Sequence, residues 1–206
     1  MNTHLSREGQ FTMTARERIL DAAASVMRER GIARATTKEI ARVAGCSEAL
    51  LYKYFADKQE IFLGVLSERM PPIAGAAELT GTVRENLETL TRDVLVFYVQ
   101  TFPIAAAVFS EADLLTAWRD GLRARDAGPH VVHAIVEDYV ASERRAGRLP
   151  ISIDPWATAV LLCGAALQQA FLATFAGETE IPDAGEVAAR LVAGVLGPAE
   201  RHAPPR

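Results

Sequence analysis

The chain has 206 residues, of which 50% are hydrophobic, and a formal net charge of −4 at pH 7. This apolar content suffices for one buried core or two smaller ones, and the negative charge excludes a protein that coats nucleic acid without regard to sequence. The charge is divided unevenly, because residues 1–69 carry 11 Lys/Arg and 9 Asp/Glu whereas residues 70–206 carry 11 and 17. A weak basic excess therefore lies in the first third of the chain.

The first 13 residues are polar, so residues 1–13 are predicted to form a disordered arm rather than a secretory signal. The chain has two cysteines, Cys46 and Cys163, which fit a reducing cytoplasm without disulfides. A redox role for either stays open, although neither has a Cys, His or basic neighbour arranged to activate it. The expected location is cytoplasmic.

The first predicted helix runs from about Thr14 to Arg30. Thr14 and Glu17 have the spacing of a capping box, and Gly31 ends the helix. Apolar residues recur along one face at helical spacing: Ile19, Ala22, Ala23, Val26 and Met27.

A short helix is predicted next, beginning at Thr36 or Thr37, because Thr36 and Glu39 form another capping box. Gly45 ends it, at a position where a left-handed backbone angle is cheapest for glycine. Three of its residues fall at i, i+3 and i+4 and are expected to be buried: Ile40, Val43 and Ala44.

A second short helix follows the turn, with Ser47 as its N-cap. Leu51 and Phe55 are expected to face inward, which presents the opposite face to solvent: Glu48, Ala49, Tyr52, Lys53 and Tyr54. A helix–turn–helix with its second helix presented outward is typical of proteins that place side chains in the major groove of DNA. The predicted core of this three-helix unit is Ile19, Ala23, Val26, Ile40, Leu51 and Phe55.

The segment resembles the DNA-binding domain of the TetR family of transcriptional regulators over about residues 14–69. The matching residues are Gly31-Ile32, Thr36-Thr37, Ile40-Ala41, Ala44-Gly45-Cys46-Ser47, Leu51-Tyr52, Tyr54-Phe55 and Lys58. Cys46 replaces the usual Val, which is a small apolar exchange. The resemblance implies an all-α fold, with an N-terminal three-helix helix–turn–helix DNA-binding domain and a C-terminal helical domain for ligand binding and dimerisation.

The resemblance also implies which residues contact DNA. Thr37 and Tyr54 are expected at phosphates, and Lys38 is expected to reach a guanine edge. Glu48 and Ala49 occupy base-reading positions, where Glu accepts from a cytosine amino group and Ala contacts a thymine methyl. The full expected set is Thr37, Lys38, Ser47, Glu48, Ala49, Tyr52, Lys53, Tyr54 and Lys58.

Asp57 and Glu60 start a fourth helix that runs to about residue 70, where Pro71-Pro72 halts it. We interpret it as the connector between a helix–turn–helix DNA-binding domain, residues 14–70, and a ligand-binding and dimerisation domain, residues 71–206. The second domain reads as helix throughout. The first predicted helix of this domain covers about 82–101 and is broken by Pro103, after which a shorter helical stretch runs to about 125. Three further helices are predicted at about 129–147, 155–176 and 183–197.

Residues 155–177 contain no charged residue and are long enough to span a bilayer. Because they have polar members and no flanking Lys/Arg cluster, a soluble helix buried on most sides is expected, and no membrane. This helix and the apolar stripe at residues 132–140 are both expected to need partners. In the family the corresponding helices of two subunits form a four-helix bundle, so the resemblance implies a homodimer that presents two recognition helices to a palindromic site.

Aromatic residues and a few polar groups of the C-terminal part suit a pocket for a small organic effector. The alternative is that these aromatics are plain core. No His/Cys/carboxylate grouping has ligand spacing, so no metal or other cofactor is expected. The candidate pocket residues are Phe97, Phe102, Phe109, Trp118, His133, Gln168 and Phe171.

These features predict a ligand-responsive transcriptional regulator, most simply a repressor that binds a palindromic operator as a homodimer and is released by a small organic molecule. The alternative is an architectural DNA-binding protein without an effector, which the acidic C-terminal part opposes. An enzyme is not expected, because no Ser/His/Asp grouping, Gly-rich phosphate loop or pair of catalytic carboxylates stands out. The effector, the operator and the regulated genes do not follow from the sequence.

Overall fold

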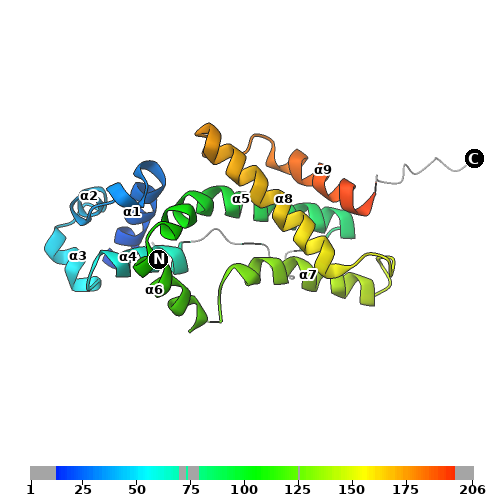
Figure 1. The fold of residues 1–206 in the computed structure, drawn as a ribbon, viewed down its shortest axis with the longest axis horizontal. Helices are drawn as coiled ribbons and strands as arrows, with labels where there is room; N and C mark the ends of the chain where they lie inside the picture. The colour runs from blue at the N-terminus through cyan, green and yellow to red at the C-terminus, as the bar shows by residue number, and fades with distance from the viewer. Residues whose placement is uncertain (1–12, 70–72, 74–78, 125, 198–206) are drawn as a thin grey trace, which may run out of the picture. The chain divides into compact units, whose positions relative to one another are not determined.

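A computed structural model describes residues 13–69, 73, 79–124 and 126–197. Every regular element in these ranges is a helix (Figure 1), which confirms the all-α prediction. The chain divides into two compact units, Met1–Arg69 (unit 1) and Met70–Arg206 (unit 2). The predicted arm, residues 1–13, lies outside the described residues except for Met13, and Pro71-Pro72 lies outside them as well.

Unit 1 contains the helices α1 (Ala15–Arg30), α2 (Thr37–Val43), α3 (Glu48–Tyr54) and α4 (Lys58–Glu68), with a 3-10 turn, η1 (Ile32–Arg34), after α1. Each α-helix follows a residue whose side-chain oxygen accepts a hydrogen bond from the backbone N–H three positions on. Such a cap contributes about 1 kcal/mol to stability. The capping residues are Thr14, Thr36, Ser47 and Asp57.

The core of unit 1 is the predicted one, since all six of its expected members are buried: Ile19, Ala23, Val26, Ile40, Leu51 and Phe55. The prediction for Val43 was wrong, because 43% of this residue is exposed. Ala41 is buried in its place. In a helix of seven residues only a narrow stripe meets α1, and that stripe is centred between Ile40 and Ala41 rather than toward Val43.

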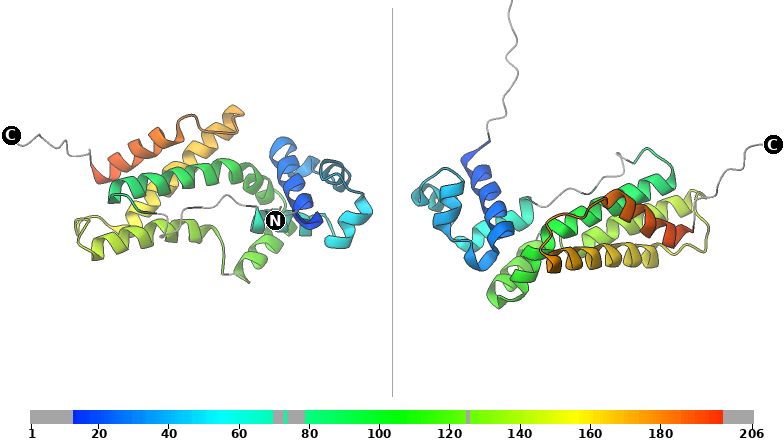
Figure 2. Two further views of the ribbon diagram at one scale, coloured as in Figure 1. Left: turned by 180° about the vertical axis from the view of Figure 1, so that it is seen from behind. Right: turned by 90° about the horizontal axis from the view of Figure 1, so that it is seen from above.

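Unit 2 is a layered helical body made of α5 (Val83–Phe109), α6 (Ala112–Arg123), α7 (Pro129–Arg145), α8 (Pro155–Ala176) and α9 (Ala184–Leu196). Helix α5 packs against α8 and α9, and α7 packs against α8. Figure 2 shows α9 running beside α5 and α8 in both views. The starts of α5 and α8 are capped by the side chains of Thr82 and Asp154.

The predicted break at Pro103 was wrong, because α5 continues through it to Phe109. A proline in a helix removes one backbone hydrogen bond and crowds the preceding turn. The turns around it are nevertheless held by burial, since Val99, Ile104 and Val108 all lie in the core. Helix α5 curves along its course instead of ending (Figure 1), as is common at a helix-interior proline.

The apolar stripe of α7 is buried within unit 2. Val132, Val136 and Val140 are buried in the core of unit 2, in one cluster with residues of α5, α8 and α9. The expectation that this stripe needs a partner chain was therefore wrong. Its apolar surface is covered by the unit's own helices.

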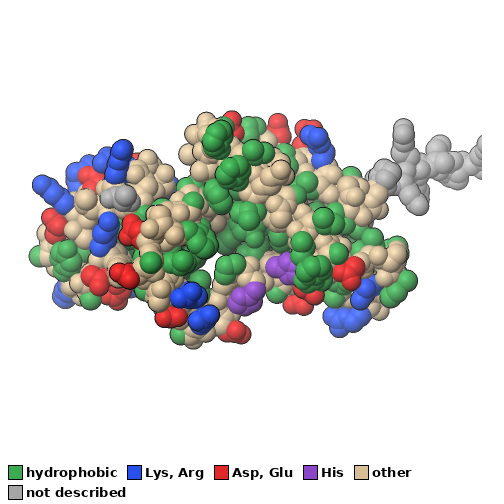
Figure 3. All heavy atoms as spheres, in the orientation of Figure 1, with side chains coloured by type: hydrophobic (Ala, Val, Ile, Leu, Met, Phe, Trp, Pro, Cys, Tyr) green, Lys and Arg blue, Asp and Glu red, His purple; other side chains and the backbone are tan. Residues whose placement is uncertain are grey.

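The prediction that helix α8 is buried on most sides was wrong, because the helix buries one side and exposes the other. Leu162, Ala166 and Ala170 are buried, whereas the opposite side carries large exposed apolar residues, which we call the outer face of α8: Trp156, Val160, Leu161, Leu167, Phe171, Leu172 and Phe175. Hydrophobic side chains are visible along this helix in Figure 3. By length and composition, α5 and α8 are each apolar enough to cross a membrane, a property that core helices of soluble proteins share.

Candidate nucleic-acid interface

The turn between α2 and α3 is built from local hydrogen bonds. The Thr36 hydroxyl accepts from the backbone N–H of Glu39 at 3.2 Å, and the Ser47 hydroxyl accepts from that of Leu50 at 3.2 Å. Between them Gly45 has φ of +65°, the left-handed region that glycine adopts without steric cost. The two helices are thereby joined by a turn of defined geometry.

Helix α3 is anchored on one side and open on the other. Leu51 is fully buried, and Phe55, which follows the helix, is 2% exposed. Tyr52 is 51% exposed and Tyr54 is 40% exposed. The whole predicted outward face is exposed: Glu48, Ala49, Tyr52, Lys53 and Tyr54. Helix α3 therefore presents two large aromatic side chains to solvent.

Three of the predicted DNA-contacting residues are linked to one another. The Thr37 hydroxyl lies 3.1 Å from Oε2 of Glu48, and the Tyr52 hydroxyl lies 3.4 Å from the Thr37 oxygen. The start of α2 is thus connected across the turn to two positions of α3. This arrangement, which sequence spacing did not reveal, places polar groups of both helices at one edge of the exposed face.

The lysines around this face differ in their exposure and in their contacts. Lys38 and Lys53 are exposed, and neither has an ion-pair partner in the described part of the chain. Lys58 is half-buried, with its ammonium 3.4 Å from the carbonyl oxygen of Ile32 and 4.9 Å from the centre of the Phe62 ring. Its charge therefore lies close to the body of unit 1.

Arg42, which was not among the predicted contacts, is oriented by a carboxylate. Two hydrogen bonds of 2.9 and 2.7 Å join its guanidinium to Glu39, and Arg30 lies 2.9 Å from the same carboxylate. The hydrogen bonds from Arg42 lower the pKa of Glu39 below its usual value. The i, i+3 spacing of Glu39 and Arg42 on a helix is the signal in the sequence that could have found this pair.

Comparison with known proteins identifies the module. Residues 19–65 match the profile of "Bacterial regulatory proteins, tetR family". Residues 19–65 therefore form a TetR-type DNA-binding domain, and α2–turn–α3 is its helix–turn–helix.

Two curated HTH-type regulators resemble the chain in this region. It is 40% identical over 58 residues to the HTH-type transcriptional regulator SrpR of Pseudomonas putida, which is 28% of this chain and 27% of that protein. It is 33% identical over 84 residues to the HTH-type transcriptional activator FasR of Mycolicibacterium smegmatis, which is 40% of this chain and 38% of that protein. The match thus spans well under half of each relative's length.

Solved structures of TetR-like fold cover nearly the whole chain. The fatty acid degradation regulator FadR from Bacillus halodurans superposes with a TM-score of 0.66 at 16% identity, over 93% of this chain and 99% of that one. FadR from Bacillus subtilis, in complex with stearoyl-CoA, superposes with a TM-score of 0.61 at 16% identity, over 87% and 97%. At this identity the likeness concerns the fold.

The predicted effector-pocket residues of unit 2 differ in their burial and in their contacts. The rings of Phe102 and Phe171 meet edge to face with centroids 6.0 Å apart. Phe97 packs against the core cluster, and Phe109 is 67% exposed. Gln168 is exposed on α8. Of this aromatic set, Phe102 and Phe171 form the ring contact seen among the described residues.

His133 makes a different set of contacts. Its Nδ1 lies 3.3 Å from a carboxylate oxygen of Glu137, and its ring lies 6.4 Å from that of Trp156. Its Nε2 is buried and has no hydrogen-bond partner among the described residues. The same holds for Nε1 of Trp118 and for the hydroxyl of Thr174, which lies outside the predicted pocket set.

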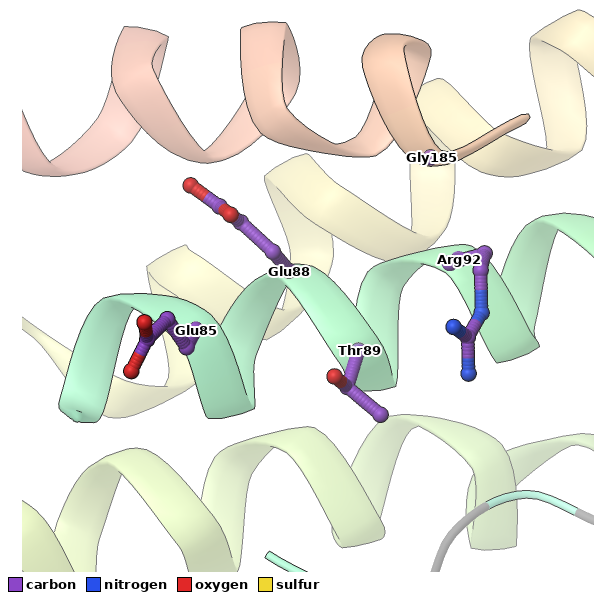
Figure 4. Close-up of a pocket in the computed structure, with 5 residues that line it drawn as sticks. All are labelled: Glu85, Glu88, Thr89, Arg92 and Gly185. Carbon is purple, nitrogen blue, oxygen red and sulfur yellow. The ribbon is translucent and has the colours of Figure 1, made fainter. Parts of the chain in front are cut away.

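A polar surface depression lies between α5 and α9, away from the predicted pocket residues. It has a volume of about 280 Å³ and is lined by Glu85, Glu88, Thr89, Arg92 and Gly185 (Figure 4). None of the predicted pocket residues lines it. Glu85 already accepts hydrogen bonds from Thr82 at the start of α5. Within the described ranges no three His, Cys, Asp or Glu residues are grouped as metal ligands would be.

Proposed function

We propose that this protein is a TetR-family transcriptional regulator, a cytoplasmic repressor that binds a palindromic operator as a homodimer and is released by a small organic effector. The observation that carries the proposal is the exposed outward face of α3, with Tyr52 and Tyr54 presented beside Lys53. A helix of this kind enters the major groove, while its neighbours contact phosphates.

The roles expected from the sequence fit the exposed positions. Lys38 and Lys53 are exposed cations without a protein partner among the described residues, and phosphates are the natural partners of such cations. Thr37 begins α2, where the first backbone N–H groups have no acceptor within the helix. The proposed contact set is Thr37, Lys38, Ser47, Glu48, Ala49, Tyr52, Lys53, Tyr54 and Lys58.

The outer face of α8 supports the homodimer. At 3.6 residues per turn its exposed apolar residues fall within an arc of about 160°, and they include seven large side chains. Soluble monomers rarely expose a continuous apolar patch of that extent. We expect a second copy of the same face, related by a two-fold axis, to cover it, and the exposed Gly164 allows close approach of the two helices.

The effector is proposed to occupy the helical part of unit 2. An unpaired buried polar atom costs about 1–3 kcal/mol, so Trp118, His133 and Thr174 each offer a position where a ligand group relieves that cost. The TetR-like FadR of Bacillus subtilis was solved with stearoyl-CoA, which makes this compound the first probe. A ligand acts here by favouring the dimer geometry that does not match the operator.

Selection of random duplexes with the full-length protein tests the DNA-binding part of the proposal. The expected result is one palindromic site protected in a footprint, with half-sites about one helical turn apart. Placed upstream of a reporter gene, that site should give lower expression when the protein is present. Higher expression means an activator, and binding to all duplexes alike means that the architectural alternative holds.

A further inference from the structure

The hydrogen-bonded chain of Thr37, Glu48 and Tyr52 has a fixed direction. An ionised carboxylate only accepts hydrogen bonds, so at 3.1 Å the Thr37 hydroxyl donates its proton to Oε2 of Glu48. The Thr37 oxygen then keeps its lone pairs for the Tyr52 hydroxyl, which lies 3.4 Å away. Tyr52 therefore donates to Thr37, and Thr37 donates to Glu48.

This direction restricts what Thr37 does at the DNA. Its hydroxyl proton is committed to Glu48 and is not free for a phosphate. Its backbone N–H lies in the first turn of α2 and has no acceptor in the helix. A phosphate contact by Thr37 is therefore made by the backbone, while the side chain holds Glu48.

Glu48 itself has one carboxylate oxygen engaged and one open. It lies at the first position of α3, where the helix dipole stabilises a negative charge, and it is exposed. Among the described residues it has no cationic partner. A bare carboxylate at the groove-facing end of a recognition helix is repelled by DNA phosphates, so its presence does not serve affinity.

The open carboxylate oxygen needs a hydrogen-bond donor. In the major groove cytosine presents its N4 amino group, and adenine presents N6 beside the acceptor N7. Guanine and thymine present acceptors at the corresponding edges. A carboxylate is repelled by each of these acceptors, and the N7 lone pair of adenine opposes it as well, so cytosine is the base that fits.

We propose that Thr37 is a positioning residue that orients Glu48 through this hydrogen bond. Glu48, at the base-reading position that the family resemblance implies, then selects cytosine at one position of each half-site. Glu48 excludes other sequences rather than adding affinity. This inference rests on the proposed function, because it requires a sequence-specific DNA complex. Tyr52 completes the chain by restraining the Thr37 hydroxyl.

The test compares the full-length protein with Glu48→Ala and Glu48→Gln on duplexes that carry each of the four base pairs at every half-site position. Wild type should prefer cytosine at one position by about 5- to 100-fold, the range of a good base contact. Glu48→Ala should abolish that preference and bind a scrambled duplex more tightly than wild type does. Glu48→Gln should shift the preference to adenine, because Gln pairs with its N6 and N7.

The role of Thr37 is tested by two variants, one that lacks the hydroxyl and one that keeps it. Thr37→Val lacks the hydroxyl and should weaken the cytosine preference at the same position, while Thr37→Ser should restore it. A uniform loss of affinity on all duplexes for Thr37→Val means that the hydroxyl binds phosphate and overturns the positioning role. Glu48 is exposed and Thr37 is partly exposed, and helical content by circular dichroism verifies that each variant is folded.

The outcomes separate the inference from the proposed function. If wild type selects a site and Glu48→Ala keeps the same base preferences, the assignment of Glu48 is wrong while the operator-binding function stands. If wild type discriminates between no duplexes, the function itself fails, and the assignment fails with it.

Discussion

The guanidinium of Arg16 in α1 forms two hydrogen bonds, of 2.6 and 2.7 Å, with the carboxylate of Glu68 in α4. The same guanidinium lies 5.3 Å from the centre of the Phe55 ring. Arg16 therefore joins the first and last helices of unit 1 and covers the residue that follows the recognition helix. Both side chains of the ion pair remain partly exposed, so solvent weakens their attraction.

Replacement of Arg16 should loosen unit 1 by a modest amount. Arg16→Ala loses a surface ion pair and a cation–π contact, which together contribute about 1 kcal/mol. Faster amide hydrogen exchange in α1 and α4 is the expected readout, and high salt should reduce the difference from wild type. Arg18→Ala, in the same helix and without a recorded partner among the described residues, is the matched control. Equal exchange in the two variants would show that the pair contributes nothing.

Replacement of Lys58 distinguishes a phosphate contact from a structural one. If its ammonium binds phosphate, Lys58→Ala should weaken binding to all duplexes and reduce the slope of log K against log salt by about one. Lys58→Arg, which keeps the charge, should retain the slope. An unchanged slope combined with lower stability would assign the ammonium to its contacts with Ile32 and Phe62 instead.

A charge on the outer face of α8 should separate the dimer. Leu161 is 60% exposed there, and Leu161→Arg buries an unpaired charge in the proposed interface, which costs several kcal/mol. Sedimentation should show a monomer at concentrations where wild type is a dimer, with operator binding lost as well. Ile151→Arg is the control, since Ile151 is 85% exposed in the α7–α8 connection and off that face. A monomeric wild type would refute the proposed assembly.

The thiol of Cys163 should be inert in the folded protein. Burial raises its pKa to about 11, so little thiolate, the reactive form, is present at pH 8. Cys46 is partly exposed and should be alkylated first by iodoacetamide, as mass spectrometry of the peptides will show. Cys163 should react only in denaturant. Rapid alkylation of Cys163 in the native state would contradict its burial.

Unit 2 should lose stability at alkaline pH. Burial raises the pKa of Tyr98 to about 12 and that of Cys163 to about 11, so both groups are neutral in the fold at a pH where the unfolded chain ionises them. Their stabilising effect is complete below pH 9 and is lost as the pH rises from about 9 to 12. Thermal unfolding followed by Trp fluorescence measures this, because Trp118 and Trp156 both lie in unit 2. Cys163→Ala should reduce the loss of stability in the lower part of this pH range.

The features that were predictable from the sequence depend on neighbours within a few residues. The caps at Thr14, Thr36 and Ser47 join a side chain to a backbone N–H three positions on, and Gly45 ends α2 through its own backbone angle. The burial of Leu51 follows from the period of the helix. Such interactions are nearly independent of the remaining chain, which is why helix starts and the exposed face of α3 could be read directly.

Other features were decided by contacts between segments far apart in the chain. Pro103 is a local helix breaker, but packing of Val99 and Ile104 keeps α5 continuous. The apolar stripe of α7 and the uncharged helix α8 were both predicted to need partners, but the tertiary structure covers the first and leaves the outer face of the second exposed. The hydrogen bond between Thr37 and Glu48 likewise joins two helices, and the spacing of residues along the sequence does not reveal how those helices are placed relative to each other. The sequence by itself determined the helices and their apolar faces, whereas the tertiary structure decided which faces are covered, because burial depends on what packs against a helix and not on the helix alone.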